Sequence, residues 1–140
     1  MKKVRSYGII PLKKKDDGWH VLITRHYEGH WGFPKGRPEK DEQPLDTAKR
    51  ELHEETGLDI VKLVKPEPLE EHYTFTKNDI TFDKAVTYYI AEVEGVVILQ
   101  HDEVLESMWV KVEEAEQYVS FPETKKLCAA LSMFNDQCSM

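Results

Sequence analysis

The sequence predicts an α+β fold in which strands and helices alternate around one core. The chain has 140 residues, of which 40% are hydrophobic, which is the usual size of one domain with one core. Several segments have the alternation or β-branched content of strands, and two segments repeat apolar residues at helical spacing. Strands interleaved with two helices form an α+β or three-layer domain. We therefore expect a single domain over residues 1–140.

Strands are predicted first in the N-terminal part of the chain. Asp16, Asp17 and Gly18 form a turn signal between two strand-like segments, so these two strands are expected to pair as a hairpin. The segments with strand character cover residues 4–12, 19–25, 60–65, 70–75, 85–93 and 107–112.

The first helix is predicted over residues 44–56. Pro44 suits the first helical position, and Gly57 suits the position just past the end. A second helix is predicted to begin near residue 121, and residues 112–118 to add a turn or two of helix. Apolar side chains recur at helical spacing in both helices, and we assign them to core packing. They are Leu45, Ala48 and Leu52 in the first helix, and Leu127, Ala130, Leu131 and Phe134 in the second.

The net charge and the composition of the chain restrict the kinds of molecule that it is expected to bind. A net charge of -7 argues against broad electrostatic binding to nucleic acid or to an anionic membrane. A small phosphate-bearing molecule is compatible with it, because bound divalent cations reverse the local charge. The chain lacks an apolar run of membrane-spanning length and the pattern of a signal peptide, and Cys128 and Cys138 have neither zinc nor disulfide spacing. We expect a cytoplasmic monomer without membrane contact or stable nucleic-acid binding.

The first predicted helix carries a cluster of carboxylates. Glu51 and Glu55 are four residues apart and therefore neighbours, and Glu54 is next to both. Arg50 can pair with Glu54 one turn later, but one guanidinium does not neutralise the whole cluster. A solvated acidic face is one interpretation. The other is a site for a hard cation such as magnesium or manganese, which prefers oxygen ligands.

The spacing around this cluster bears on that choice. Residues 36–58 read GRPEKDEQPLDTAKRELHEETGL, with Gly36, Glu42, Arg50, Glu51, Glu54, Glu55, Gly57 and Leu58 at fixed intervals. Together with Leu52, which directly follows Glu51, these positions resemble the signature of the Nudix hydrolases. The predicted order of elements resembles that family's α/β/α sandwich with a mixed central sheet. The resemblance implies a loop, helix and loop motif that binds Mg²⁺ or Mn²⁺ and hydrolyses a nucleoside diphosphate linked to another group.

The resemblance also implies roles for individual residues. Glu51 and Glu55 would be the principal metal ligands, Glu54 a further ligand or the base, and the main-chain carbonyl of Lys35 another ligand. The motif residues with structural roles would be Gly36, Glu42, Arg50 and Gly57. In physical terms, bound cations neutralise the phosphate oxygens and lower the pKa of a bound water, and a nearby carboxylate takes its proton.

Segments outside the motif resemble the asymmetrical diadenosine tetraphosphate hydrolases of this family. In GHWGFPKG (residues 29–36), His30 and Lys35 would contact phosphates, with Trp31 and Phe33 either substrate contacts or core residues. In DKAVTYYIAEV (residues 83–93), the resemblance implies that Lys84 and Tyr88 reach phosphates, although a tyrosine pair on a strand also fits one core and one surface residue.

Two further predictions concern an additional carboxylate and the residues that hold the adenine ring. In HDEVLESMWV (residues 101–110), the resemblance points to Glu103 as one more ligand or base, with Asp102 and Glu106 as alternatives. Adenine requires a flat apolar clamp. The candidates for it are Tyr73, Phe75 and Phe134, for each of which core packing is the alternative.

We therefore predict metal-dependent hydrolysis of diadenosine tetraphosphate to ATP and AMP. The alternatives are a Nudix RNA 5′-pyrophosphohydrolase and a nucleoside triphosphate pyrophosphatase. A non-enzymatic alternative is a catalytically dead module that binds nucleotides. Such a module is expected to have lost Arg50 or one of the clustered glutamates, and this chain retains them all.

Overall fold

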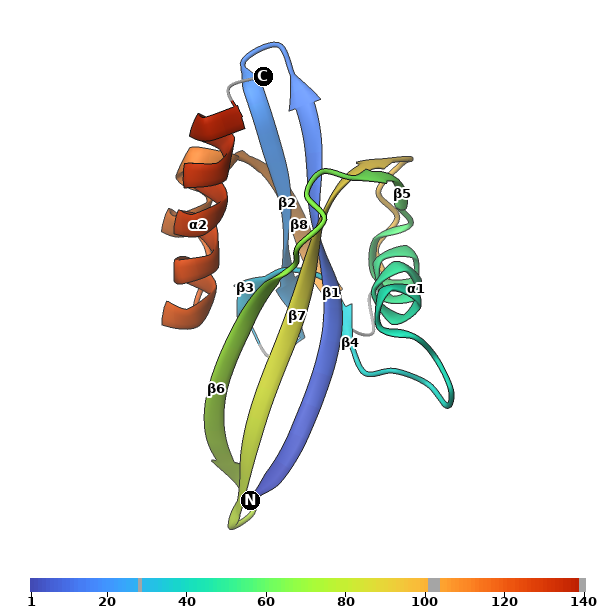
Figure 1. The fold of residues 1–140 in the computed structure, drawn as a ribbon, viewed down its shortest axis with the longest axis vertical. Coiled ribbons are helices and arrows are strands. Elements are labelled where there is room, and N and C mark those ends of the chain that lie inside the picture. The colour runs from blue at the N-terminus through green and yellow to red at the C-terminus, as the bar shows by residue number, and fades with distance from the viewer. Residues whose placement is uncertain (28, 101–103, 139–140) are drawn as a thin grey trace.

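The computed structural model describes residues 1–27, 29–100 and 104–138. In these ranges an eight-stranded sheet forms the middle layer, with α1 against one face and α2 against the other (Figure 1). The strands are β1 (Lys2–Lys15), β2 (Gly18–His26), β3 (Trp31–Gly32), β4 (Lys35–Gly36), β5 (Asp59–Leu63), β6 (Leu69–Lys77), β7 (Ile80–Glu94) and β8 (Val104–Lys111). The helices are α1 (Pro44–Thr56), α2 (Pro122–Cys138) and the 3-10 helix η1 (Val112–Gln117).

The sheet is mixed. β1 and β7 run parallel at its centre, from Lys2 opposite Phe82 to Leu12 opposite Glu92. The other recorded strand pairs are antiparallel. The predicted α+β fold with a mixed central sheet is therefore confirmed. The predicted hairpin of β1 and β2 is also confirmed, since its register closes at Lys15 opposite Gly18.

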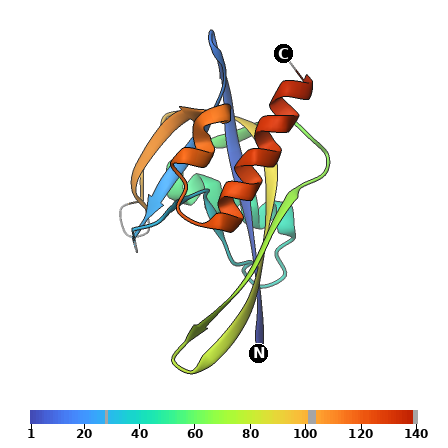
Figure 2. The same cartoon turned by 90° about the vertical axis from the view of Figure 1, so that its left-hand side faces the viewer.

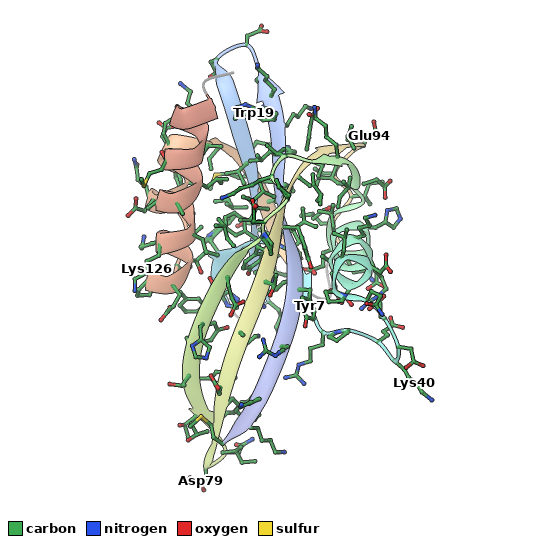
Figure 3. The ribbon with its side chains drawn as sticks, in the orientation of Figure 1. Tyr7, Trp19, Lys40, Asp79, Glu94 and Lys126 are labelled. Atoms are coloured by element: carbon green, nitrogen blue, oxygen red, sulfur yellow. The ribbon has the colours of Figure 1, made fainter. Side chains whose placement is uncertain are left out.

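The two central strands exceed their predicted ranges by more residues than the other strands do. β1 and β7 continue because each supplies the other with hydrogen-bonding partners beyond the apolar segment. β7 also begins earlier because a turn at Asn78 and Asp79 joins it to β6. β3 and β4 were not predicted, since two-residue strands have no periodicity to detect. The outer parts of β1, β6 and β7, residues 2–5, 73–77 and 80–84, project past the helices as an arm with Asp79 at its tip (Figure 3).

Alternating side chains divide the core between the two faces of the sheet. Ile9 and Leu22 belong to the cluster under α1, whereas the next residues, Ile10 and Ile23, belong to the cluster under α2. This alternation explains why the central strands are apolar on both faces.

Three of the four residues predicted for the apolar stripe of α2 can be compared with the structure. Leu127 and Leu131 are buried as expected, but Ala130 is exposed. Cys128, 1% exposed, occupies the buried position instead, because it shares a helix face with Leu131 and Thr124. The Phe134 side chain lies outside the described part of the chain. Within that part, no helix is both long and apolar enough to cross a membrane.

Helix α1 begins and ends at the predicted residues. Pro44 lies in its first turn, and Leu52 is fully buried beneath it. Gly57 follows the helix with a φ of 79° and donates its N–H to the carbonyl of His53 at 2.8 Å. A left-handed conformation at this position favours glycine, so the sequence signal for the helix end is confirmed.

Candidate active site

The carboxylates of α1 differ in their exposure. Glu55 follows Leu52 by three residues, so it lies on the buried face of the helix and is 1% exposed. The Glu51 side chain is 12% exposed, whereas that of Glu54 is 51% exposed. The cluster is therefore not uniformly solvated, and Glu55 is the member most removed from water.

Arg50 connects the helix to the preceding loop. Its Nε and Nη2 donate to the two oxygens of Glu42 at 2.8 and 3.0 Å, and its Nη1 donates to Glu51 at 3.0 Å and to Glu54 at 3.2 Å. Glu42 also accepts from the Thr47 hydroxyl at 2.7 Å. The hydrogen bonds from Arg50, above all, lower the pKa of Glu42 to about 2. These contacts support the structural roles predicted for Arg50 and Glu42.

Two glycines allow the main chain at Lys35 to lie between β1 and α1. A Cβ at Gly36 would overlap the Glu51 carboxylate, so glycine leaves room for that carboxylate against the backbone. On the other side, Gly8 of β1 is paired with Lys35, and a Cβ there would overlap the Pro34 carbonyl. Gly36 was predicted as a structural residue, but Gly8 was not, because its neighbour Pro34 is remote in sequence.

The oxygen atoms near Glu51 and Lys35 are of the kind that bind a hard cation. The Glu51 carboxylate lies against the Gly36 backbone. Lys35, whose carbonyl was predicted as a ligand, directly precedes Gly36 in the chain. Carboxylate and carbonyl oxygens are the donors that such cations prefer. In the described ranges, no three histidine, cysteine or acidic side chains are already grouped closely enough to hold a metal ion.

A cleft of about 940 Å³ opens between the end of β2, the N-terminal end of α2, and the β6–β7 hairpin. It brings together six of the residues predicted from sequence, although they come from separate segments. These are His30, Lys35, Glu55, Tyr73, Phe75 and Lys84. The cleft is also lined by His26, Tyr27, Thr74, Thr76, Lys77, Phe121 and Glu123.

Lys35 and Lys84 both line the cleft, and their charges are close enough to interact. The pKa of Lys84 falls to about 8, because burial disfavours its charged form and because Lys35 and Arg37 are nearby. Clustered like charges repel one another unless an anion lies between them. This part of the cleft therefore favours a polyanion such as a phosphate chain.

Stacked rings form another wall, which the sequence analysis missed. His26 stacks on His30 with centroids 4.9 Å apart, and His30 lies 5.0 Å from Phe121. Burial, followed by the charges of Lys35 and His30, lowers the pKa of His26 to about 3, so His26 is neutral at neutral pH. Phe121 was noted only as the start of a helix, although its position just before Pro122 already predicted an exposed ring at the N-terminal end of that helix.

A buried hydrogen bond joins two walls of the cleft. The Thr124 hydroxyl of α2 donates to Glu71 of β6 at 2.9 Å, and both residues are nearly inaccessible. Burial raises the pKa of Glu71, although the bond from Thr124 opposes this effect. Because Tyr73 lies two residues farther along β6, this bond holds the strand that carries Tyr73 against the helix that follows Phe121.

The Tyr88 side chain is buried, whereas a residue that contacts a substrate in the cleft is expected to be accessible. It is 2% exposed, its ring packs edge-on against Phe33 at 5.6 Å, and burial raises its pKa. Its neighbours include a small cavity of about 20 Å³ beneath the cleft, which Lys35 and Glu71 also line. Core packing therefore describes its ring, and the predicted contact with a phosphate stays a prediction.

Some predicted site residues fall outside the part of the chain that the structure describes. Glu103 and its alternative Asp102 are among them, and so is the side chain of Phe134. The other alternative, Glu106, accepts a hydrogen bond from Arg25 at 2.7 Å. This ion pair joins β2 to β8.

Comparison with known proteins identifies the family. The NUDIX domain model matches residues 2–130. This chain belongs to the Nudix family. The resemblance found in residues 36–58 is thereby confirmed, and the Nudix fold accounts for the mixed sheet between two helices. Nudix hydrolases act on small nucleotides and generally use divalent metal ions.

Relatives of this Nudix chain differ in their reported substrates. It is 34% identical over 132 residues to the asymmetrical bis(5′-nucleosyl)-tetraphosphatase of Rattus norvegicus, covering 87% of this chain and 88% of that protein. It is 33% identical over 78 residues to the RNA pyrophosphohydrolase of Bartonella henselae, covering 51% of this chain and only 45% of that protein. The structure of a C. elegans Ap4A hydrolase binary complex matches with a TM-score of 0.73 at 23% identity, covering 94% of this chain and 96% of that one. At this identity the structural match shows the fold.

Proposed function

We propose that this chain hydrolyses a dinucleoside polyphosphate with the help of a divalent cation, splitting diadenosine tetraphosphate into ATP and AMP. The observation that carries the proposal is the composition of the cleft, which combines the acidic Glu55, the cationic Lys35 and Lys84, and the rings of Tyr73 and Phe121. The carboxylate suits a reacting phosphate with its cation, the lysines suit a phosphate chain, and the rings suit a nucleobase. The match along 88% of the rat tetraphosphatase supports the same class of substrate.

The cation would be held by oxygen atoms around α1. Glu51, Glu55 and the Lys35 carbonyl are the proposed ligands, with Glu54 and Glu103 as further ones. We propose Mg²⁺, with Mn²⁺ as the alternative, because Mg²⁺ usually keeps several waters and binds through one or two carboxylates together with substrate phosphates. When bound, such an ion neutralises phosphate charge and makes a bound water more acidic.

The protein groups have separate tasks in this reaction. His30, Lys35 and Lys84 bind the phosphate chain, and Tyr73 and Phe121 hold a base by stacking. A water oxygen forms a bond to phosphorus while the bond from that phosphorus to the bridging oxygen breaks. One of the clustered carboxylates accepts the proton of the water. Arg50 holds Glu51 and Glu54 in place throughout.

Product analysis tests this proposal. The protein would be incubated with magnesium and, separately, with diadenosine tetraphosphate, 8-oxo-dGTP and 5′-triphosphorylated RNA, and the products separated by chromatography. We expect ATP and AMP, formed fastest from the first substrate. Faster release of pyrophosphate from RNA would favour the second candidate, an RNA pyrophosphohydrolase, to which the Bartonella relative points. We also propose a cytoplasmic monomer, and size-exclusion chromatography with light scattering tests its oligomeric state.

A further inference from the structure

The arm carries aromatic rings beyond the base clamp of Tyr73 and Phe121. Phe75 of β6 stacks on Phe82 of β7 with centroids 5.0 Å apart and planes inclined by 17°. Phe75 is 37% exposed and Ile80, close to the turn, is 39% exposed. Phe82 is half-buried. Large apolar side chains usually gain stability by burial, so a stacked pair with one exposed ring on a narrow arm suggests a ligand surface.

These rings lie on the face of the sheet that α2 covers farther along. Val86 and Tyr88 of β7 are packed in the cluster that includes residues of α2. Phe82 shares their face, because side chains on a strand alternate, and Phe75 is directly opposite Phe82. The arm continues past the N-terminal end of α2 (Figures 1 and 2). Val86 is fully buried in the cluster under α2, whereas Phe75 is exposed and Phe82 is half-buried.

The same cleft reaches the arm. Its lining runs along β6 from Tyr73 through Phe75 to Lys77. A strand rises by about 3.3 Å per residue, so the cleft continues about 13 Å beyond Tyr73. A single nucleobase held between Tyr73 and Phe121 would leave this extension unfilled.

The charges along the extension indicate what fills it. Lys84 is paired with Tyr73 and Lys77 with Ile80, so cationic groups lie on either side of the Phe75 and Phe82 rings on one face. A flat apolar surface between cations suits a nucleobase attached to a phosphate chain, and stacking accepts any base. We propose that Phe75, supported by Phe82, binds the second nucleobase of a dinucleoside polyphosphate. This inference rests on the proposed function, since that substrate carries a base at each end.

Binding measurements test the inference without depending on turnover. The probes are diadenosine tetraphosphate and adenosine 5′-tetraphosphate, both with methylene groups in place of the oxygens that bridge phosphorus atoms, titrated calorimetrically with magnesium present. Phe75→Leu keeps an apolar side chain and removes the ring. Phe82→Leu removes the supporting ring, and Tyr118→Leu, which replaces an exposed aromatic residue outside the cleft lining, is the control.

We expect Phe75→Leu to raise the Kd of the two-base probe by about fivefold or more, with the one-base probe unchanged, because a stacking contact with one base is lost. Phe82→Leu should act in the same direction, and Tyr118→Leu should change neither Kd. Equal changes for both probes, or no change, would overturn the inference. A loss confined to a 5′-triphosphorylated RNA dinucleotide would also overturn it, by assigning the surface to RNA. Failure of the unmodified protein to cleave ordinary diadenosine tetraphosphate would instead overturn the proposed function.

Discussion

The difference in burial between Glu55 and Glu54 leads to a quantitative prediction. Glu55 is 1% exposed and lines the cleft, whereas the Glu54 side chain is 51% exposed and contacts Arg50. Two unit charges about 4 Å apart interact by about 4 kcal/mol at an effective dielectric constant near 20, but by about 1 kcal/mol in water. The charge of Glu55 therefore acts far more strongly on a bound cation than the charge of Glu54.

Glu55→Gln removes that charge and keeps the shape of the side chain. We expect kcat to fall at least about a hundredfold, which corresponds to about 2.7 kcal/mol in the activation barrier. The matched variant Glu54→Gln should lower kcat by about fivefold, from about 1 kcal/mol. Steady-state kinetics with diadenosine tetraphosphate would measure both effects.

Folding controls separate this effect from damage to the protein. Glutamine at position 55 relieves repulsion within the cluster and the cost of burying a charge, so the Tm of Glu55→Gln should not fall. Near-normal turnover of Glu55→Gln would refute the proposed role of the Glu55 charge in holding the cation. A larger loss for Glu54→Gln than for Glu55→Gln would show that exposure is the wrong guide to the role of these carboxylates and would favour Glu54 as the base.

Other predictions concern stability and pH. Leu52→Ala leaves a cavity under α1 and should lower the free energy of unfolding by about 2–5 kcal/mol in urea titrations, and a loss below about 1 kcal/mol would mean that this core is loosely packed. Gly57→Ala must adopt a φ of 79° with its Cβ about 3.1 Å from the Val96 carbonyl, so we expect a loss of about 1–2 kcal/mol in the same assay, and no loss would contradict the strained geometry. Because the pKa of Lys84 is about 8, its charge disappears as the pH rises through that value, and KM should increase. Lys84→Arg keeps its charge and should abolish this increase in KM. If KM of this variant depended on pH in the same way as that of the unmodified protein, the effect would belong to another group.

Sequence alone was sufficient for the features that depend on local chemistry. Helix α1 was predicted to the residue, because Pro44 and Gly57 act on the backbone within a single turn. The spacing of Arg50 and the three carboxylates led to the Nudix family for a similar reason, since it lies within one helix and its preceding loop. Local spacing also predicted the contact between Arg50 and Glu54, which are one turn apart.

The tertiary structure decided which of these groups are buried and which lie together. Glu54 and Glu55 are adjacent in sequence, yet one is half exposed and the other is nearly inaccessible, because only one of them faces the sheet. Tyr88 was matched to a phosphate contact by resemblance, but packing with Phe33 places its ring in the core. No sequence pattern linked His26 to Phe121, because the ring contacts that each makes with His30 join segments that are remote in the chain. Burial and long-range contact depend on how such segments pack, and no local pattern of residues contains that information.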